Sequence, residues 1–260
     1  MALADEFDGL LIDLDGVVWI GREPVPGSAE TLRTLIARGK RVAFVTNNPA
    51  RPPAAYAERL RELGVEVGPE QVVTAGMAAA SLAAAAAGPD GSAFVIGRAP
   101  LKELVAAAGL TVLEGEAGRE AGVVVVSGHR DFDYAALLTA KRALDRGAAL
   151  IGTSRDPTMP MPGGEWPGTG AILAAVETAS GRVAEIAGKP ERHLFEIALE
   201  AIGRPARVAM VGDRVSSDVE GGRRAGLATV LVLSGTDSED PATAEPQPDH
   251  VVADLAALLA

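Results

Sequence analysis

Two carboxylates follow directly on an apolar run near the N-terminus: Asp13 and Asp15 in "LLIDLDGVVW", residues 10–19. An unpaired carboxylate is costly to bury, so acids at the end of a core strand need a cation or hydrogen-bond donors to balance them. Aspartate is already ionised at neutral pH, and an ionised carboxylate can act as a covalent nucleophile without a base to activate it. The pair therefore indicates a reactive site rather than core filling.

Other polar side chains follow further apolar runs along the chain. Thr46 and Asn47 follow "RVAFV", Lys189 follows "VAEIAG", Asp213 follows "RVAMVG", and Asp218 lies about one turn beyond. Ligands of open parallel sheets bind outside the carboxyl ends of the strands, so these residues are the candidates for a site. Together they offer a nucleophile, hydrogen-bond donors, one fixed cation and hard oxygen ligands for a metal ion.

The elements that must position these residues alternate between short β-branched runs and helical patterns, which is typical of a parallel sheet covered by helices. The predicted strands are apolar throughout, as burial on both faces requires. A second set of strands and helices interrupts the first. We therefore expect an α/β protein with a parallel-sheet core, formed by residues 1–76 and 182–260 and including "VAEIAG" as a core strand, and an inserted α/β domain at residues 77–181.

The amino-acid composition argues against several classes of function. The chain has 260 residues, is 48% hydrophobic and carries a formal net charge of −11, whereas nucleic-acid binders present a basic surface. It has no cysteine, so disulfides and thiolate metal sites are excluded. No run reaches the roughly 18 apolar residues of a membrane span, and the first residues do not resemble a secretory leader. We expect a cytoplasmic protein with neither nucleic-acid nor membrane partners.

Four short motifs resemble those of the haloacid dehalogenase superfamily, in the same order: "DLDGV", "VTNN", "GKP" and "VGDRVSSD". The resemblance covers nearly the whole chain and implies a Rossmann-like core and an aspartyl-phosphate mechanism that uses Mg²⁺. By this resemblance Asp13 would be the nucleophile and a metal ligand. Asp15 would be the acid and base, and would touch the metal through its backbone carbonyl. Asp213 would ligate the metal, with Asp218 supporting the site.

The same resemblance implies that Thr46, Asn47 and Lys189 bind the phosphoryl group. Charge balance agrees with this reading. An ionised Asp13 facing a phosphate dianion, with two further carboxylates nearby, would assemble about five negative charges that repel one another strongly at low dielectric. Mg²⁺ and Lys189 would supply three positive charges, and phosphoryl transfer is accelerated mainly by positioning and charge stabilisation.

The spacing of the motifs places the insertion. Thr46 lies 33 residues after Asp13, which leaves room for a turn and one helix, whereas Lys189 lies 143 residues after Thr46. A cap domain must therefore follow the second motif. This arrangement resembles the branch that contains 4-nitrophenyl phosphatases, phosphoglycolate and glycerol phosphate phosphatases and the NagD nucleotide phosphatase. The resemblance implies that the protein hydrolyses a small phosphorylated metabolite. A homodimer is possible.

The stretches "SGHRDFDYAAL" and "GTSRDPTMPMPGGEWPGTGAIL" resemble the cap of that branch. Ser154 stands where asparagine is common there, which puts a substrate contact by this residue in doubt. "SS" replaces a more usual "DT" before Asp218. Arg155 and Trp166 are candidates for substrate specificity, with packing as the alternative for Trp166.

Rival functions use similar residues. A signalling receiver module also combines a strand-end aspartate, a hydroxyl residue and a lysine, but has neither an inserted cap nor the second acid at Asp15. A dehalogenase would lack that second acid, and a sugar phosphomutase would carry its cap between the first two motifs. A capped protein that binds phosphate with little turnover remains an alternative.

Overall fold

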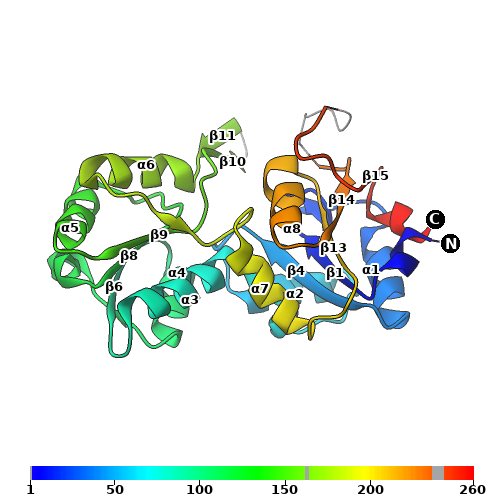
Figure 1. Ribbon diagram of the computed structural model, residues 1–260, viewed down its shortest axis with the longest axis horizontal. Helices are drawn as coiled ribbons and strands as arrows, with labels where there is room; N and C mark the ends of the chain where they lie inside the picture. Colours follow the sequence, from blue (N-terminus) through cyan, green and yellow to red (C-terminus); the bar gives the residue numbers. More distant parts are fainter. Residues whose placement is uncertain (1, 162–163, 236–242) are drawn as a thin grey trace. The chain divides into compact units, whose positions relative to one another are not determined.

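The computed structural model describes residues 2–161, 164–235 and 243–260. The chain divides into two compact units (Figure 1). Unit 1 and unit 2 are each made of separate segments: Met1–Thr46, Pro53–Val73 and Lys189–Ala260 for unit 1, and Asn47–Pro52 and Thr74–Gly188 for unit 2.

Unit 1 is built on a six-stranded sheet in the order β15-β14-β13-β1-β4-β5. The neighbouring strands β15, β14, β13, β1 and β4 run parallel to one another. The strands span β1 Gly9–Asp13, β4 Arg41–Thr46, β5 Val72–Thr74, β13 Val208–Gly212, β14 Ala228–Val232 and β15 His250–Val252. All five residues of β1 are buried, as expected for a central strand covered on both faces.

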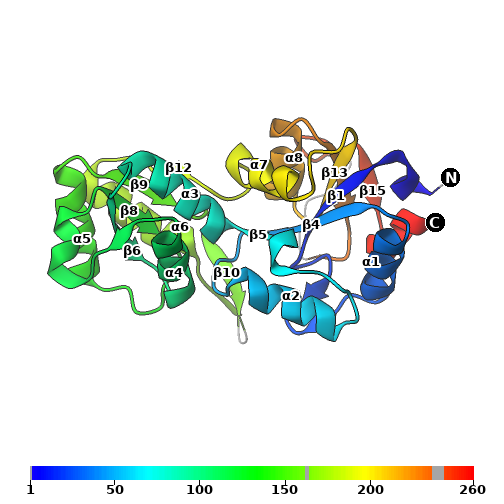
Figure 2. The same ribbon diagram turned by 90° about the horizontal axis from the view of Figure 1, so that it is seen from below.

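Helices cover both faces of this sheet. Figure 2 shows α7 and α8 on one face and α1 and α2 on the other. Their bounds are α1 Ser28–Ala37, α2 Pro53–Glu62, α7 Arg192–Ala201 and α8 Glu220–Arg224. A short hairpin, β2 Trp19–Ile20 with β3 Glu23–Pro24, follows β1. The described residues of the unit also form the 3₁₀ turns η1 Leu3–Glu6, η2 Pro69–Gln71 and η5 Leu255–Leu259, and the π-helical turn η4 Val215–Val219.

Unit 2 has its own five-stranded sheet, in the order β12-β9-β8-β6-β7 and parallel throughout. Its strands are β6 Ser92–Ile96, β7 Thr111–Val112, β8 Val123–Val126, β9 Ala149–Gly152 and β12 Glu185–Ile186. Its helices are α3 Ala75–Ala87, α4 Ala99–Ala107, α5 Tyr134–Asp145 and α6 Thr169–Ser180, with the 3₁₀ turn η3 Gly115–Glu120. A hairpin of β10 Thr158–Met161 and β11 Gly164–Pro167 precedes α6.

The expected fold class, a parallel-sheet α/β core interrupted by a second α/β unit, is confirmed. One strand assignment was wrong. We expected "VAEIAG" in the core sheet, but β12 pairs with β9 of unit 2. Unit 2 accordingly extends over Thr74–Gly188, whereas the expected insertion ran over residues 77–181. An apolar run that fits a parallel sheet does not reveal which of two such sheets it joins.

No helix among the described residues is long and apolar enough to cross a membrane.

Candidate active site

The polar residues of three motifs lie at one edge of the unit 1 sheet. Asp13 ends β1 and is in register with Val45 of β4, so Thr46 follows at the same level. On the other side of β1, Ile12 is in register with Val211 of β13, and Asp213 directly follows that strand. Because these strands are parallel, their carboxyl ends bring the three side chains to the same edge.

Three carboxylates gather there. One oxygen from each of Asp13, Asp213 and Asp218 lies within 4.8 Å of the others, and all three residues are buried, with exposed fractions of 6%, 3% and 1%. Lys189, itself 4% exposed, donates from Nζ to Oδ1 of Asp13 at 2.8 Å and to Oδ1 of Asp218 at 2.7 Å. If all four groups are ionised, one ammonium faces three carboxylates. A divalent cation would balance the remaining charge, and hard carboxylate oxygens are the ligands that Mg²⁺ prefers.

The contacts of Asp13 and Asp218 differ in a way that separates their tasks. Oδ1 of Asp13 accepts hydrogen bonds from the backbone N–H of Leu14 at 2.8 Å and from Lys189. Both of these contacts are on the same oxygen, Oδ1. Asp218 uses both oxygens internally, Oδ1 for Lys189 and Oδ2 for the backbone N–H of Arg214 at 3.0 Å. Asp218 therefore anchors the lysine.

Burial raises the pKa of Asp13 well above its ordinary value. Lys189 opposes that shift, while Asp218 and Asp213 add to it. Burial alone would lower the pKa of Lys189, but the adjacent Asp13 and Asp218 outweigh it and raise the pKa. The lysine thus stays charged, and without a further cation burial favours the protonated form of Asp13.

Glycines allow the backbone to close around these acids. A Cβ on Gly16, whose φ is +90°, would lie 2.2 Å from Oδ2 of Asp213, and one on Gly235 would lie 1.9 Å from the same atom. A Cβ on Gly212 would lie 2.2 Å from Cγ of Asp218. The backbone thus packs closely against these carboxylates, which fixes the positions of the oxygens that a cation would need.

Asp15 is not part of the carboxylate cluster. It is exposed, and its Oδ1 accepts a hydrogen bond from the indole Nε1 of Trp19 at 3.0 Å. The chain reverses at Gly16, directly after Asp15. Separate environments for Asp13 and Asp15 are what a nucleophile and a proton carrier require.

The remaining phosphoryl-binding candidates lie at the end of β4 and in unit 2. Thr46 is buried, with an exposed fraction of 2%. Asn47 begins the short segment of unit 2. A Cβ on Gly188 would lie 2.5 Å from both Oδ1 of Asn47 and the carbonyl oxygen of Thr153. A side chain at the glycine of the "GKP" motif would thus collide with the backbone carbonyl of Thr153 as well as with the Asn47 side chain.

The two specificity candidates of unit 2 already have partners. Arg155 forms a fork with Glu177, with Nη2 2.8 Å from Oε1 and Nη1 3.1 Å from Oε2. Trp166 is 39% exposed, and the guanidinium of Arg130 lies 4.4 Å from the centroid of its ring. Trp166 is therefore partly accessible with Arg130 over its ring, whereas Arg155 would have to leave its ion pair to contact a substrate.

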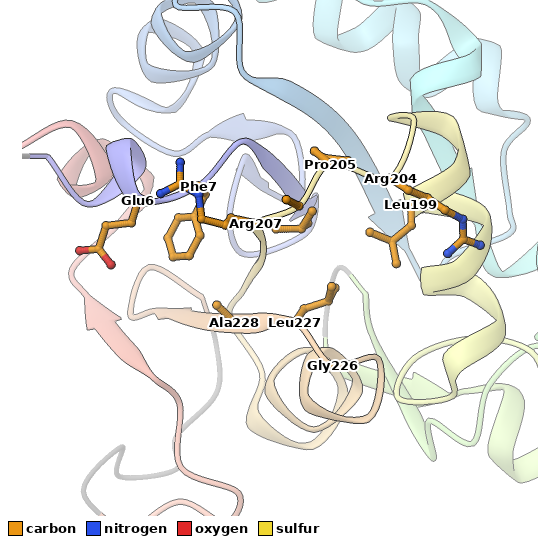
Figure 3. A pocket seen from close by; sticks show the side chains of 11 residues that line it. Glu6, Phe7, Leu199, Arg204, Pro205, Arg207, Gly226, Leu227 and Ala228 are labelled. Atoms are coloured by element: carbon orange, nitrogen blue, oxygen red, sulfur yellow. The ribbon is translucent and has the colours of Figure 1, made fainter.

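A hollow of about 630 Å³ lies at the opposite edge of the unit 1 sheet (Figure 3). Phe7, Val208 and Ala228, at the amino ends of β1, β13 and β14, are among its lining residues. Its two arginines are engaged, Arg204 with Glu196 and Glu200 and Arg207 with Asp8. The candidate catalytic residues are at the other end of these strands, so this hollow is separate from the candidate active site.

A family model described as "Haloacid dehalogenase-like hydrolase" matches residues 10–111, and one described as HAD-hydrolase-like matches residues 186–258. The chain is 40% identical to the glycerol-3-phosphate phosphatase of Mus musculus over 262 residues, which cover 91% of this chain and 82% of the relative. The chain belongs to the haloacid dehalogenase-like hydrolase family.

Solved structures of this hydrolase family have the same fold. The glycerol phosphate phosphatase of Mycobacterium tuberculosis, solved in complex with magnesium, superposes with a TM-score of 0.91 at 35% identity, covering 100% of this chain and 78% of that one. The p-nitrophenyl phosphatase of Archaeoglobus fulgidus gives 0.89 at 33% identity, covering 97% and 98%. The predicted family and branch are confirmed.

Sequence reasoning missed Trp19, although it lies four residues after Asp15 in the first motif. A tryptophan at the start of an apolar strand is equally well explained by core packing, so the residue type did not indicate a role in the site. It also missed Gly16 and Gly235, whose close approach to Asp213 depends on the three-dimensional arrangement.

Proposed function

We propose that this hydrolase is a Mg²⁺-dependent phosphomonoester phosphatase that acts on small phosphate esters through a covalent aspartyl-phosphate at Asp13. The observation that carries the proposal is the buried Asp13 carboxylate, whose Oδ1 is held by Leu14 N–H and Lys189 while Oδ2 is left for attack. The phosphatase prediction agrees with the names of the relatives.

Two displacements complete the reaction. In the first, an Asp13 oxygen forms a bond to phosphorus while the bond from phosphorus to the ester oxygen breaks, and the departing alkoxide takes a proton from Asp15. In the second, a water attacks the phosphorus and gives its proton to the Asp15 carboxylate. Inorganic phosphate leaves and the free Asp13 carboxylate returns. The acid of the first step thus becomes the base of the second.

Positive charge and hydrogen-bond donors must offset the charge of the transferring group. Lys189 supplies a fixed ammonium that its raised pKa keeps charged. Thr46 and Asn47 would donate hydrogen bonds to phosphoryl oxygens from the carboxyl end of β4. Donors fixed before the reaction stabilise the transition state without reorganisation.

Asp13, Asp213 and the backbone carbonyl of Asp15 would hold the metal ion. When bound, Mg²⁺ supplies positive charge beside the phosphoryl oxygens and offsets repulsion among the carboxylates. Asp218 acts indirectly, because both its oxygens are engaged with Lys189 and Arg214.

Unit 2 would act as a cap that selects the leaving group, with Trp166 offering its exposed ring and Arg155 contributing once its bond to Glu177 opens. Glycerol phosphate is the first substrate to test, given the relatives. A cytoplasmic location and the absence of nucleic-acid and membrane partners stay predictions, and dimerisation stays open.

The test is phosphate release from a panel of glycerol, glycolate, nucleotide and 4-nitrophenyl phosphates, with and without Mg²⁺. Many turnovers per protein molecule, abolished by chelation, support the proposal. A receiver-like phospho-acceptor would release at most about one phosphate per chain, and a weak binding protein would release none. Either result, or undiminished turnover after exhaustive chelation, contradicts the proposed function.

A further inference from the structure

Trp19 is a large apolar side chain placed at a polar site. It is completely buried, within the main hydrophobic cluster of unit 1. A buried indole retains one hydrogen-bond donor, which needs a partner. That partner is Oδ1 of Asp15, 3.0 Å from Nε1. A residue anchored by the core therefore holds the carboxylate that the proposed mechanism uses to move protons.

The backbone between the two residues is closed on itself. Gly16 N–H donates to the carbonyl of Trp19 at 2.7 Å, and Val18 N–H donates to the carbonyl of Leu14 at 2.9 Å. Gly16 supplies the positive φ, +90°, that this reversal needs. The turn fixes the start of β2 opposite Asp15, so the contact does not depend on a mobile loop.

Arg59 of α2 fixes the indole from outside. Its guanidinium carbon lies 3.9 Å from the centroid of the Trp19 ring, and its Nη2 donates to the carbonyl of Gly21 at 2.7 Å. A cation over the ring face is attracted by the ring quadrupole. The tryptophan is thus held by the core on one side and by a tethered arginine on the other.

We propose that Trp19 is a positioning residue that orients Asp15 for proton transfer, an inference that rests on the proposed function. With Oδ1 engaged by the indole N–H, Oδ2 is the oxygen presented to the leaving group. The contact fixes the orientation of the Asp15 carboxyl group before the reaction, so that Oδ2 meets the leaving group in one geometry.

The inference predicts an effect that depends on the leaving group. Trp19→Phe keeps an aromatic ring but removes the donor. General acid–base catalysis contributes roughly 10²–10⁴-fold, and we expect the variant to lose about tenfold or more in the single-turnover attack step with glycerol phosphate. It should lose less than about twofold with 4-nitrophenyl phosphate, whose leaving group needs little protonation. Decay of the phosphoenzyme should slow as well.

The decisive measurement is a double-mutant cycle with Asp15→Asn. If Trp19 acts through Asp15, Trp19→Phe should change the attack rate by less than about twofold in the Asn background. Equal losses in both backgrounds, or equal losses for good and poor leaving groups, overturn the inference. Leu35→Val, which removes volume from the same hydrophobic cluster, should lower thermal stability without changing the leaving-group dependence.

If Trp19→Phe fails to fold, site-specific replacement of the indole by its benzothiophene analogue keeps the shape and exchanges N–H for sulfur. The same leaving-group dependence is expected, and its absence overturns the inference. Failure of the proposed function gives a different result, since the wild-type protein with Mg²⁺ would then form no phosphoenzyme at Asp13.

Discussion

Lys189 and Asp218 form a buried ion pair, with Nζ 2.7 Å from Oδ1. The lysine also contacts Asp13, so Asp218 sets where the only ammonium of the described cluster stands. This relationship separates two acids that the sequence alone places in one motif: Asp218 contacts Lys189, whereas Asp213 is the one proposed to bind the metal ion.

Replacing Asp213 and replacing Asp218 should therefore have different effects on Mg²⁺ affinity and on the reaction rate. Asp213→Asn should lower Mg²⁺ affinity sharply, because it removes a charged ligand while leaving β13 intact. Asp218→Ala should lower the rate by about ten- to a hundredfold, as loss of an outer-shell partner typically does, with a smaller change in Mg²⁺ affinity. Calorimetric titration with Mg²⁺ and steady-state kinetics measure the two effects. Equal loss of Mg²⁺ affinity in both variants would show that Asp218 is itself a ligand.

The raised pKa of Asp13 predicts how the metal-free protein responds to pH. The folded state binds this proton more tightly than the unfolded chain does. The resulting stabilisation is complete below the ordinary aspartate pKa of about 3.9 and is lost as pH rises through the raised folded value. Lowering pH from neutral should therefore raise the contribution of Asp13 to stability.

The measurement is the difference in unfolding free energy between wild type and Asp13→Asn, followed across pH without metal. The unfolding free energy of the wild type should increase relative to that of the variant as pH falls from neutral. Saturating Mg²⁺ should remove this trend, because bound metal favours the ionised carboxylate. A wild-type advantage that shrinks on acidification of the metal-free protein would contradict the direction of the shift.

Gly16→Ala should impair the metal site through sterics. The new Cβ would meet Oδ2 of Asp213 at 2.2 Å, and the residue must keep a φ of +90°. We expect weaker Mg²⁺ binding, measured by titration, together with a stability loss of about 1 kcal/mol or more from the strained backbone.

Gly39→Ala is the matched control, since Gly39 also has a positive φ, +77°, but a Cβ at this position would have nothing within 4 Å. It should lose stability with unchanged Mg²⁺ affinity. If both variants bind Mg²⁺ like the wild type, the close approach at Gly16 does not position Asp213.

Substitutions in unit 2 should change substrate specificity, whereas substitutions in unit 1 should change the rate of the chemical step. Trp166→Ala should change the ratio of kcat/KM between glycerol phosphate and 4-nitrophenyl phosphate, and Arg155→Ala should do so less, because its guanidinium is bound to Glu177. Val183→Ala, at an 82% exposed site of the same unit, is the control. Equal proportional losses for both substrates would count against a selective role.

Sequence patterns predicted the α/β class, the interrupted core and the order of the strand-end residues, because burial on both faces leaves a clear apolar signal in β1 and β13. They misplaced β12, since a short strand carries no mark of the sheet it joins. The anchoring of Lys189 by Asp218 and the contact of Trp19 with Asp15 depend on side-chain geometry, which spacing along the chain does not encode.

In the proposed mechanism Asp13 becomes phosphorylated and Asp15 supports both proton transfers. The most direct measurement is rapid acid quenching during turnover of glycerol phosphate with Mg²⁺, followed by peptide mass spectrometry of the acyl-phosphate. We predict phosphate on Asp13 in the wild type, more of it in Asp15→Asn with 4-nitrophenyl phosphate, and none in Asp13→Asn. Hydrolysis of glycerol phosphate at the wild-type rate by Asp13→Asn, or a phosphoenzyme modified at another residue, would contradict this mechanism.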